Sequence, residues 1–449
     1  MTKTILFLGN SVTSIDQFRI LIDQMKECFD LSIKCVLFDV QKREFVYRED
    51  VVTEPPSADS NSLRPDAGVR KTTLRHIGRA VKRLLKRTCI GFFVEYRDWC
   101  FLYRNSEKLA KNLLDTIRPD LVISNSDRTN PIPLFVFKES KDIFHVVMPA
   151  GLLGTVESTA SNAFKQRSHS VNHIYDLKRF VASKYPNQAI RIGGKTALFF
   201  EASQIVALRK FGILTEFPWI EGGYAETDMV CVANEQDKNL ICKYTEKKVL
   251  ITGLIEDYVV SQSLPLRDEI RKRIKKRYEI CSEEICILGV PNYAELNLCS
   301  MNTHTHNMEL LIDLLAKRFG TIALSFHPLS NLENYKSLKR KQGVVFLQER
   351  LRDVIVAADY YFSEDTSSTS RWAKISGCKW IPLLTEKWKF ELSKADIEKY
   401  LMCIDLKDNL DCIMHKSMYS DPIDMNKLVD IKTVLVECLN TDSKGHAYE

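Results

Sequence analysis

Two short segments of this chain combine side chains that bind or protonate phosphates. The first reads Ser-Phe-His-Pro at 325–328 and ends an apolar run, and the second reads Ser-Ser-Thr-Ser at 367–370. Pro328 fixes its own φ and disfavours helical geometry at His327, which should therefore project from a strand end. An imidazole there can donate a hydrogen bond or a proton, and hydroxyls before a helix add donors to its free N–H groups. The segments predict a phosphate site formed by His327, Pro328, Ser367, Ser368 and Thr369.

Each half of this site has an ordinary structural alternative. A histidine at a strand end often bonds to a neighbouring carbonyl, and a serine or threonine before a helix commonly serves as its N-cap. One cap needs only one hydroxyl residue, however, whereas four hydroxyl residues follow one another at 367–370. The clustering therefore favours phosphate binding over capping.

A carboxylate that accepts a proton from a substrate hydroxyl would complete a site for group transfer. Asp127 is the preferred candidate, because it lies in a polar loop after the apolar run 121–123 and should face the cleft. Glu157 and Glu221 are the alternatives. Asp127 could equally cap a turn, and Arg128 beside it could bind an acidic substrate or pair with Asp127. The predicted catalytic residues are Asp127 and His327.

Short apolar runs alternate with helical patterns along both halves of the chain. Such alternation indicates parallel sheets made of strand–helix–strand units, with strands buried on both faces. Ligands of these sheets bind beyond the carboxyl ends of the strands, where His327, Asp127 and the hydroxyls at 367–370 fall. The predicted strands are 4–10, 32–38, 119–127, 143–148, 229–233, 248–253, 285–290, 321–326, 343–347, 358–362 and 379–383.

The predicted fold class is α/β, with two Rossmann-like doubly wound domains that face each other across a cleft. A length of 449 residues exceeds one ordinary core and supports two domains of about 200 residues each. We place the first domain at 1–260 and the second at 261–440, with a connector at 256–265. The remainder, 441–449, is expected to be a flexible tail.

The composition narrows the class of protein. Hydrophobic residues make up 45% and charged residues 27%, as in soluble globular proteins, and the net charge of +6 is small for a general nucleic-acid binder. The 13 cysteines include no CxxC pair and are expected to be reduced thiols. The N-terminus has no signal-peptide pattern, and no run approaches the ~20 apolar residues of a spanning helix. A cytoplasmic location is expected.

Residues 69–87 predict a basic amphipathic helix. Leu74, Ile77, Val81 and Leu84 recur at helical spacing, while eight lysines and arginines cover the remaining faces. The helix is either a solvated surface helix or a dock for an anionic membrane, where each basic residue adds about 1 kcal/mol. The second interpretation places the protein peripherally on the inner membrane.

The second half resembles the nucleotide-binding domain of GT-B glycosyltransferases, above all bacterial sialyltransferases and Kdo transferases, which use CMP-activated sugars. The His-Pro and Ser-Ser/Thr motifs of those enzymes match residues 327–328 and 367–369. In such families the histidine contacts the donor phosphate and the serines hold it. The similarity covers roughly residues 228–385 and, more loosely, 1–150. It also assigns Gly289 and Asn292 to the donor pocket.

The framework is also similar to UDP-N-acetylglucosamine 2-epimerases. A Gly-Asp-Thr loop and a Glu-Ala-Gly turn in that family match residues 125–129 and 148–151. Pro149 stands where the epimerase needs its glutamate, which disfavours that activity. The Glu-x7-Glu pattern of many retaining enzymes is absent as well, because Trp372 follows Glu364 at that spacing.

Two other motifs give weak signals. Residues 192–196 resemble part of a phosphate loop, but Ala189 stands where the earlier glycine is required. His304 and His306 have no neighbouring carboxylate or cysteine to complete a metal site, and we place them in a loop near the nucleotide base. No Asp-x-Asp motif stands out, so neither a metal nor a cofactor is expected.

The resemblance implies an inverting, metal-independent glycosyltransferase. Such an enzyme would move a sugar, with CMP-linked sialic acid or Kdo as the favoured donor, to a bacterial surface glycan such as capsule or lipopolysaccharide. Its partners would be the nucleotide-sugar donor and a glycan or glycolipid acceptor, without nucleic acid. The alternatives are a UDP-sugar transferase, a UDP-N-acetylglucosamine 2-epimerase-like enzyme and a catalytically inactive GT-B-like module that binds glycan.

Overall fold

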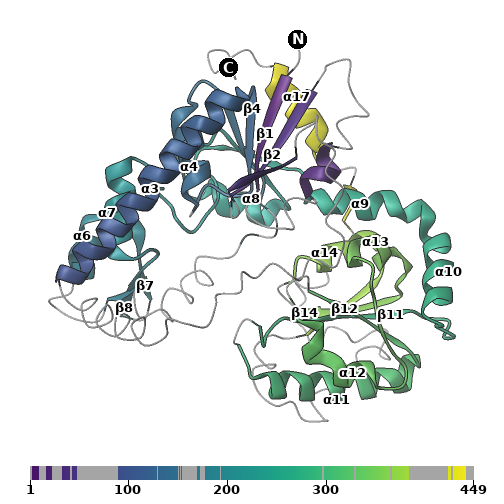
Figure 1. Cartoon of the computed structure of the whole chain (residues 1–449). Coiled ribbons are helices and arrows are strands. Elements are labelled where there is room, and N and C mark those ends of the chain that lie inside the picture. Colours follow the sequence, from purple (N-terminus) through teal and green to yellow (C-terminus); the bar gives the residue numbers. More distant parts are fainter. Residues whose placement is uncertain are drawn as a thin grey trace, which may run out of the picture. The chain divides into compact units, whose positions relative to one another are not determined.

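The protein divides into two compact units in a computed structural model (Figure 1). The first unit comprises Met1–Leu254 and Val429–Glu449, and the second comprises Ile255–Leu428. The first domain therefore ends six residues before the predicted boundary at 260, and the chain returns to it at Val429. The structure describes residues 3–9, 17–22, 33–40, 43–47, 89–128, 130–149, 151, 153, 169–171, 177–192, 194–295, 298–327, 330–364, 367–383, 423–425 and 428–440.

Four of the features singled out in the sequence lie outside the described residues. They are the basic segment 69–87, the alternative base Glu157, Pro328 of the His-Pro motif and the tail 441–449. Among the helices that are described, none combines the length and apolar character that a bilayer crossing requires.

The first unit contains a sheet whose described strands follow the order β10-β9-β5-β4-β1-β2-β3. Every neighbouring pair is parallel except β2 and β3. The apolar runs explain this arrangement, because strands covered by helices on both faces need apolar side chains on both faces. The strands are β1 Lys3–Gly9, β2 Ile33–Asp39, β3 Glu44–Tyr47, β4 Leu121–Ser124, β5 Phe144–Val147, β9 Met229–Val232 and β10 Lys248–Ile251.

Several helices of the first unit pack on this sheet and on one another (Figure 1). A smaller antiparallel sheet, with the order β6-β8-β7, belongs to the same unit. Ile192 pairs with Lys195 and Arg191 with Thr196 between the antiparallel strands β7 and β8, and Gly194 has a φ of +75°, so this segment does not have the strand-to-helix arrangement of a phosphate loop. The elements are α3 Cys89–Ile117, α4 Pro131–Glu139, β6 Ser170–Val171, α6 Leu177–Lys184, β7 Ala189–Ile192, β8 Lys195–Leu198, α7 Ala202–Phe211, α8 Glu235–Cys242 and α17 Ile431–Asn440.

The second unit contains a fully parallel sheet in the order β13-β12-β11-β14-β15. Its strands are β11 Cys286–Val290, β12 Ile322–Phe326, β13 Val344–Phe346, β14 Tyr360–Glu364 and β15 Lys379–Leu383. Its helices are α9 Ile255–Ser263, α10 Arg267–Arg277, α11 Met301–Phe319, α12 Lys336–Lys339, α13 Leu351–Val354 and α14 Ser370–Ser376.

Two local predictions for the second unit were wrong. The expected connector at 256–265 is mostly helix α9, whose first turn buries Glu256 and Asp257. The expected loop around His304 and His306 is the first part of α11, which begins after the N-cap Ser300. An N-cap serine ends the preceding loop earlier than the apolar pattern alone indicates.

Both large sheets have the strand order of a doubly wound Rossmann-like domain. Numbered within each unit, the five shared strands follow the order 3-2-1-4-5. The chain changes direction across the sheet between strands 1 and 4, and ligands of such folds bind beyond the carboxyl ends at that point. This point lies between β1 and β4 in the first unit and between β11 and β14 in the second. The prediction of two Rossmann-like α/β domains is confirmed.

Candidate functional site

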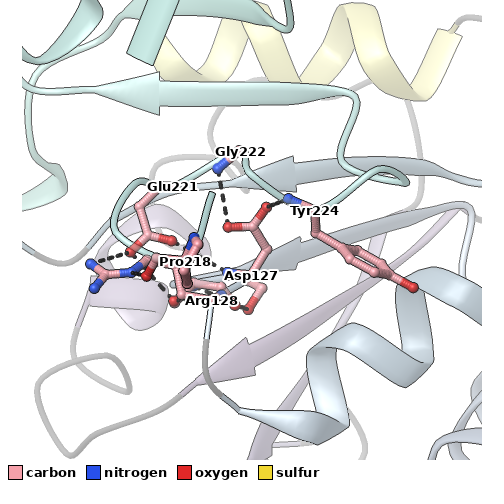
Figure 2. Close-up of polar contacts among 8 residues, drawn as sticks. Asp127, Arg128, Pro218, Glu221, Gly222 and Tyr224 are labelled. Carbon is pink, nitrogen blue, oxygen red and sulfur yellow. Dashed lines mark hydrogen bonds and ion pairs between the residues drawn. The ribbon is translucent and has the colours of Figure 1, made fainter. Parts of the chain in front are cut away.

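In the first unit, Asp127 follows the carboxyl end of β4 and is fully buried. Its Oδ1 accepts a hydrogen bond from the backbone N–H of Gly222 at 3.0 Å. Its Oδ2 accepts one from the N–H of Tyr224 at 3.1 Å and one from the hydroxyl of Thr227 at 2.7 Å. Figure 2 shows the two backbone contacts converging on one carboxylate.

The structure therefore differs from the prediction that Asp127 faces the cleft as a catalytic base. A base must reach the proton it accepts, whereas Asp127 has no exposed surface and its carboxylate accepts three hydrogen bonds of 2.7–3.1 Å inside the protein. Charge-assisted bonds of this kind satisfy a buried carboxylate. Asp127 instead fastens the loop after Pro218 to the end of β4.

Glu221 lies on the other side of the same contact (Figure 2). Its Oε2 accepts a hydrogen bond from the backbone N–H of Asp127 at 3.3 Å, and its Oε1 accepts one from the Ser126 hydroxyl at 3.4 Å. The Arg128 Nη1 lies 3.6 Å from Oε1, while the Arg128 Nε donates to the carbonyl of Pro218 at 3.1 Å. Three consecutive residues after β4 thus hold one glutamate.

Burial changes the acid–base chemistry of Glu221. Desolvation raises the pKa of its carboxyl to about 8, the nearby charge of Asp127 acts in the same direction, and Arg128 opposes the shift. A carboxylate with a pKa near neutrality is well matched to general acid–base catalysis. Only 6% of Glu221 is exposed, whereas none of Asp127 is. Glu221, an alternative in the sequence, fits the role of base better than Asp127.

Two glycines after Glu221 explain why the loop can pass so close to the sheet. Gly222 has a φ of +78°, and a Cβ there would lie 2.7 Å from a methyl group of Val230 in β9. A Cβ on Gly223 would lie 2.5 Å from the carbonyl oxygen of Phe217. The Gly-Gly pair is the sequence signal that could have pointed to this carboxylate, because two glycines allow a close approach of backbone to a packed core.

In the second unit, His327 directly follows β12 and is exposed, as predicted. Its carbonyl accepts a hydrogen bond from the N–H of Ser330 at 2.8 Å, which closes a turn. The preceding Phe326 packs against the rings of Tyr335 and Phe346. A well-packed neighbour therefore fixes the point at which the imidazole leaves the strand.

The predicted hydroxyl residues follow β14 and are half-buried. The hydroxyl groups of Ser367 and Thr369 lie 2.7 Å apart, and the Thr369 hydroxyl is also 2.7 Å from that of Tyr361. Burial raises the pKa of Tyr361, so its hydroxyl stays protonated. The hydroxyl groups of the loop thus form a connected chain that a buried tyrosine anchors.

Gly289 contributes to this arrangement by packing. It lies within β11, and a Cβ there would be 2.6 Å from the Tyr361 hydroxyl. Its predicted place in the donor pocket stays a prediction. The absence of a side chain at Gly289 gives Tyr361 the room to reach Thr369. Asn292 follows the end of β11 and is half-buried, at the edge where a ligand would bind.

A buried ion pair fixes the helix that begins after these hydroxyls. Arg371 of α14 donates to the Oδ2 of Asp257 in α9 from Nε at 2.9 Å and from Nη2 at 2.6 Å. Both side chains are buried, so removal of either partner would leave a costly isolated charge. The pair anchors the first turn of α14 and, with it, the loop 367–369.

Sequence reasoning missed Glu295, which follows β11. Its two carboxylate oxygens lie 3.0 and 3.3 Å from the Tyr335 hydroxyl. Desolvation lowers the pKa of His327, and the negative charge of Glu295 opposes that shift. Glu295 therefore lies within electrostatic range of the predicted phosphate-binding histidine. No sequence motif indicates this, because the contact joins loops after two different strands.

His304 and His306 do not form the loop that we expected near a nucleotide base. Within α11, His304 is fully buried and meets the rings of Tyr293 and Tyr335 edge-on, while His306 is exposed. Desolvation lowers the pKa of His304. His304 thus packs against Tyr335 and helps to hold its ring in place. Across the described part of the chain, no group of three or more potential metal-ligating side chains lies together.

No protein-family model matches the chain, and no curated protein does. Similar solved structures include the UDP-GlcNAc 2-epimerase from Neisseria meningitidis bound to UDP-GlcNAc, with a TM-score of 0.49, 12% identity and coverage of 98% of this chain and 99% of that chain. S. aureus MnaA with UDP has a TM-score of 0.47, 11% identity and coverage of 94% and 92%. The wall teichoic acid polymerase TagF has a TM-score of 0.47, 12% identity and coverage of 98% and 89%. The strand order of each sheet, and not these likenesses, defines the fold.

Glu221 should make the stability of the protein depend on pH. From about pH 4.5 to about pH 8, the folded state holds a proton that the unfolded state has released. The free energy of unfolding therefore falls as pH rises through this window, with a slope of up to about 1.4 kcal/mol per pH unit for one proton. Glu221→Gln removes this dependence, so the variant should gain stability relative to wild type as pH rises. Urea unfolding at a series of pH values measures the difference.

Glu216→Gln is the matched control for Glu221→Gln, because Glu216 is an exposed glutamate of the same loop region. Its unfolding curve should run parallel to that of wild type from pH 4.5 to 8. If the Glu221→Gln curve also runs parallel, Glu221 is ionised throughout this window and the assignment of a raised pKa is wrong.

Glu295→Gln should lower the pKa of His327, because the variant removes the negative charge that stabilises the imidazolium. The Cε1–H resonance of His327, identified with His327→Ala, reports its titration by NMR. Glu333→Gln is the control, since Glu333 is an exposed carboxylate of the same unit that pairs with Lys336. If the pKa of His327 is unchanged in Glu295→Gln, the conclusion that the charge of Glu295 acts on His327 is wrong.

Proposed function

We propose that the chain is a nucleotide-sugar-dependent glycosyltransferase of the GT-B type. The observation that carries this proposal is the position of His327 and of residues 367–369. They follow β12 and β14, the two strands that pair with β11 on either side of the switch point. A phosphate beyond the end of β11 would have an exposed imidazole on one flank and a hydroxyl loop on the other.

The second unit would bind the donor and stabilise its leaving group. The His327 imidazole is exposed and would donate a hydrogen bond or a proton to the phosphate that leaves. Ser368 and the linked hydroxyls of Ser367 and Thr369 would donate to its other oxygens. Because Tyr361 and the ion pair beneath α14 hold this loop in place, little ordering would remain to be done on binding.

The first unit would activate the acceptor. Glu221 in its ionised form would take the proton of the acceptor hydroxyl as the oxygen attacks the anomeric carbon of the donor. The bond from that carbon to the nucleotide phosphate breaks, and the phosphate leaves from the opposite face. Direct displacement of this kind inverts the anomeric centre and requires no covalent enzyme intermediate. No metal is part of the proposed mechanism.

The favoured donor is a CMP-linked sugar of the sialic-acid or Kdo type, and the favoured acceptor is a bacterial surface glycan or glycolipid. The His-Pro and Ser-Ser-Thr pattern at 327–328 and 367–369 supports the donor class. These sugars carry a carboxylate, and Arg128 is a partly exposed cation beside Glu221 that would bind an acidic group. A UDP-sugar donor, and with it an epimerase-like reaction, is the alternative.

A thermal-shift panel with CMP, UDP, GDP and ADP tests the donor site. A nucleotide at about a hundredfold its Kd stabilises the protein by about 2.7 kcal/mol. We expect a rise in Tm with CMP that His327→Ala loses. The control is Lys317→Ala, an exposed cation in the last turn of α11, at the opposite end of the strands. A rise in Tm with UDP alone would indicate a UDP-sugar donor. No rise in Tm with any of the four nucleotides would contradict the proposed donor site.

Glu221→Gln should separate binding from turnover. The variant should keep the nucleotide-dependent rise in Tm, because Glu221 belongs to the first unit, and should lose transfer by about 10²–10⁴-fold. Initial rates with the sugar donor that the panel indicates measure the loss. Glu216→Gln should transfer at the wild-type rate. Full activity in Glu221→Gln would exclude Glu221 as the base, and retained binding without turnover in wild type would favour a catalytically inactive module.

A further inference from the structure

Three phenylalanine side chains of the first unit project into solvent. Among the described residues, the most exposed large hydrophobic side chains are Phe101 at 68%, Phe180 at 66% and Phe93 at 65%. Single exposed apolar residues are normal on any protein surface. These three share two helices, however, since Phe93 and Phe101 belong to α3 and Phe180 belongs to α6. Such gathering usually marks an interaction surface.

The exposed phenylalanines of α3 alternate with cations along one helical face. Phe93, Arg97, Phe101, Arg104 and Lys108 are all exposed and recur at intervals of three or four residues. Residues so spaced lie in one stripe, which at ~1.5 Å per residue is roughly 22 Å long. The opposite face of α3 is in the core, with Tyr103, Ala110 and Leu113 buried.

Helix α6 repeats the same combination in a shorter form. Leu177, Phe180 and Lys184 are exposed at helical spacing, while Val181 and Ala182 are buried. The helix reads Leu-Lys-Arg-Phe-Val-Ala-Ser-Lys and contains no acidic residue. Helix α7 packs against both α3 and α6, so the three helices form one layer of the first unit (Figure 1).

The charge of this layer is predominantly positive. Among the four acidic residues of α3, Glu107 lies within ion-pair distance of Lys111 and Lys138, Glu95 accepts a hydrogen bond from Ser203, and Asp98 and Asp115 are exposed. The two exposed carboxylates are outnumbered by the exposed cations of α3 and α6, which are Arg97, Arg104, Lys108, Lys111, Arg179 and Lys184.

We infer that this surface, made of Phe93, Arg97, Phe101, Arg104 and Lys108 of α3 with Leu177, Phe180 and Lys184 of α6, docks on an anionic lipid bilayer. Aromatic and aliphatic side chains flanked by lysine and arginine are what an interfacial surface requires. The rings enter the headgroup region, and each nearby cation adds about 1 kcal/mol of attraction to anionic lipid. The inference goes beyond the proposed function and does not depend on it. A membrane-bound enzyme would, however, meet acceptors that are attached to lipid.

Co-sedimentation of the full chain with vesicles tests the inference. Wild type should bind vesicles of phosphatidylcholine mixed with phosphatidylglycerol, and should bind pure phosphatidylcholine much less. The combined variant Phe93→Ser, Phe101→Ser and Phe180→Ser should lower the partition coefficient about tenfold or more, because it removes three inserted rings. These side chains are exposed, so its Tm should remain that of wild type.

Two further variants make the test specific. The control Leu266→Ser with Leu332→Ser removes exposed apolar side chains of the second unit, at 51% and 50% exposure, and should bind as wild type does. Arg97→Gln with Arg104→Gln and Lys108→Gln should weaken binding only to the anionic vesicles, and the effect should shrink as salt rises.

Wild type that binds neither kind of vesicle would overturn the inference, as would a triple phenylalanine variant that binds as well as wild type. If wild type does not bind vesicles but forms a dimer, and the triple variant is a monomer, the surface binds a second copy of the chain and not a membrane.

Discussion

The first unit depends on one buried carboxylate, that of Asp127, and on the three donors that it holds. Two of these are backbone N–H groups, from Gly222 and Tyr224, and the third is the Thr227 hydroxyl. Each hydrogen bond to a charged group contributes about 1.5–3 kcal/mol. The Glu221 carboxylate in turn accepts a hydrogen bond from the backbone N–H of Asp127. Each of the two segments therefore binds the backbone of the other through a carboxylate. These reciprocal hydrogen bonds place Glu221 at the end of β4 and keep it almost completely buried.

The second unit also has a loop that is held by a buried polar side chain, in this case the tyrosine Tyr361. Gly289 leaves space for Tyr361, and the Tyr361 hydroxyl bonds to Thr369. The pair of Arg371 with Asp257 fixes the helix that follows. In both units, buried side chains therefore hold the loop that follows a strand. In the second unit, they position the hydroxyl loop 367–369 near the surface.

The sequence predicted the parallel strands of both large sheets because their apolar runs are continuous, as in residues 4–10 for β1 and 321–326 for β12. It missed the antiparallel strands β3, β6, β7 and β8, which are at most four residues long. It also placed His327 correctly at an exposed strand end. It did not separate Asp127 from Glu221, since the hydrogen bonds that bury Asp127 join residues about 95 positions apart. Position relative to a strand indicates which loop a carboxylate belongs to, but not which way it points.

The remaining differences have the same cause. Gly289 is a packing position because of Tyr361 on the neighbouring strand, a contact that no local pattern contains. The return of the chain to the first unit at Val429 depends on α17, whose Ile431, Val434 and Leu435 are buried, and a run of apolar residues does not specify which core it joins. Long-range partners decide these features, whereas periodicity reports only local structure.

The most direct test of the central claim is the hydrogen exchange of the Gly222 and Tyr224 amides in Asp127→Asn. If the Asp127 carboxylate anchors the loop, both amides should exchange much faster in the variant, while the amides of β12 in the second unit keep their wild-type protection. If both loop amides stay as protected as in wild type, the carboxylate does not hold the loop. The account of Asp127 as the anchor that positions Glu221 would then fail.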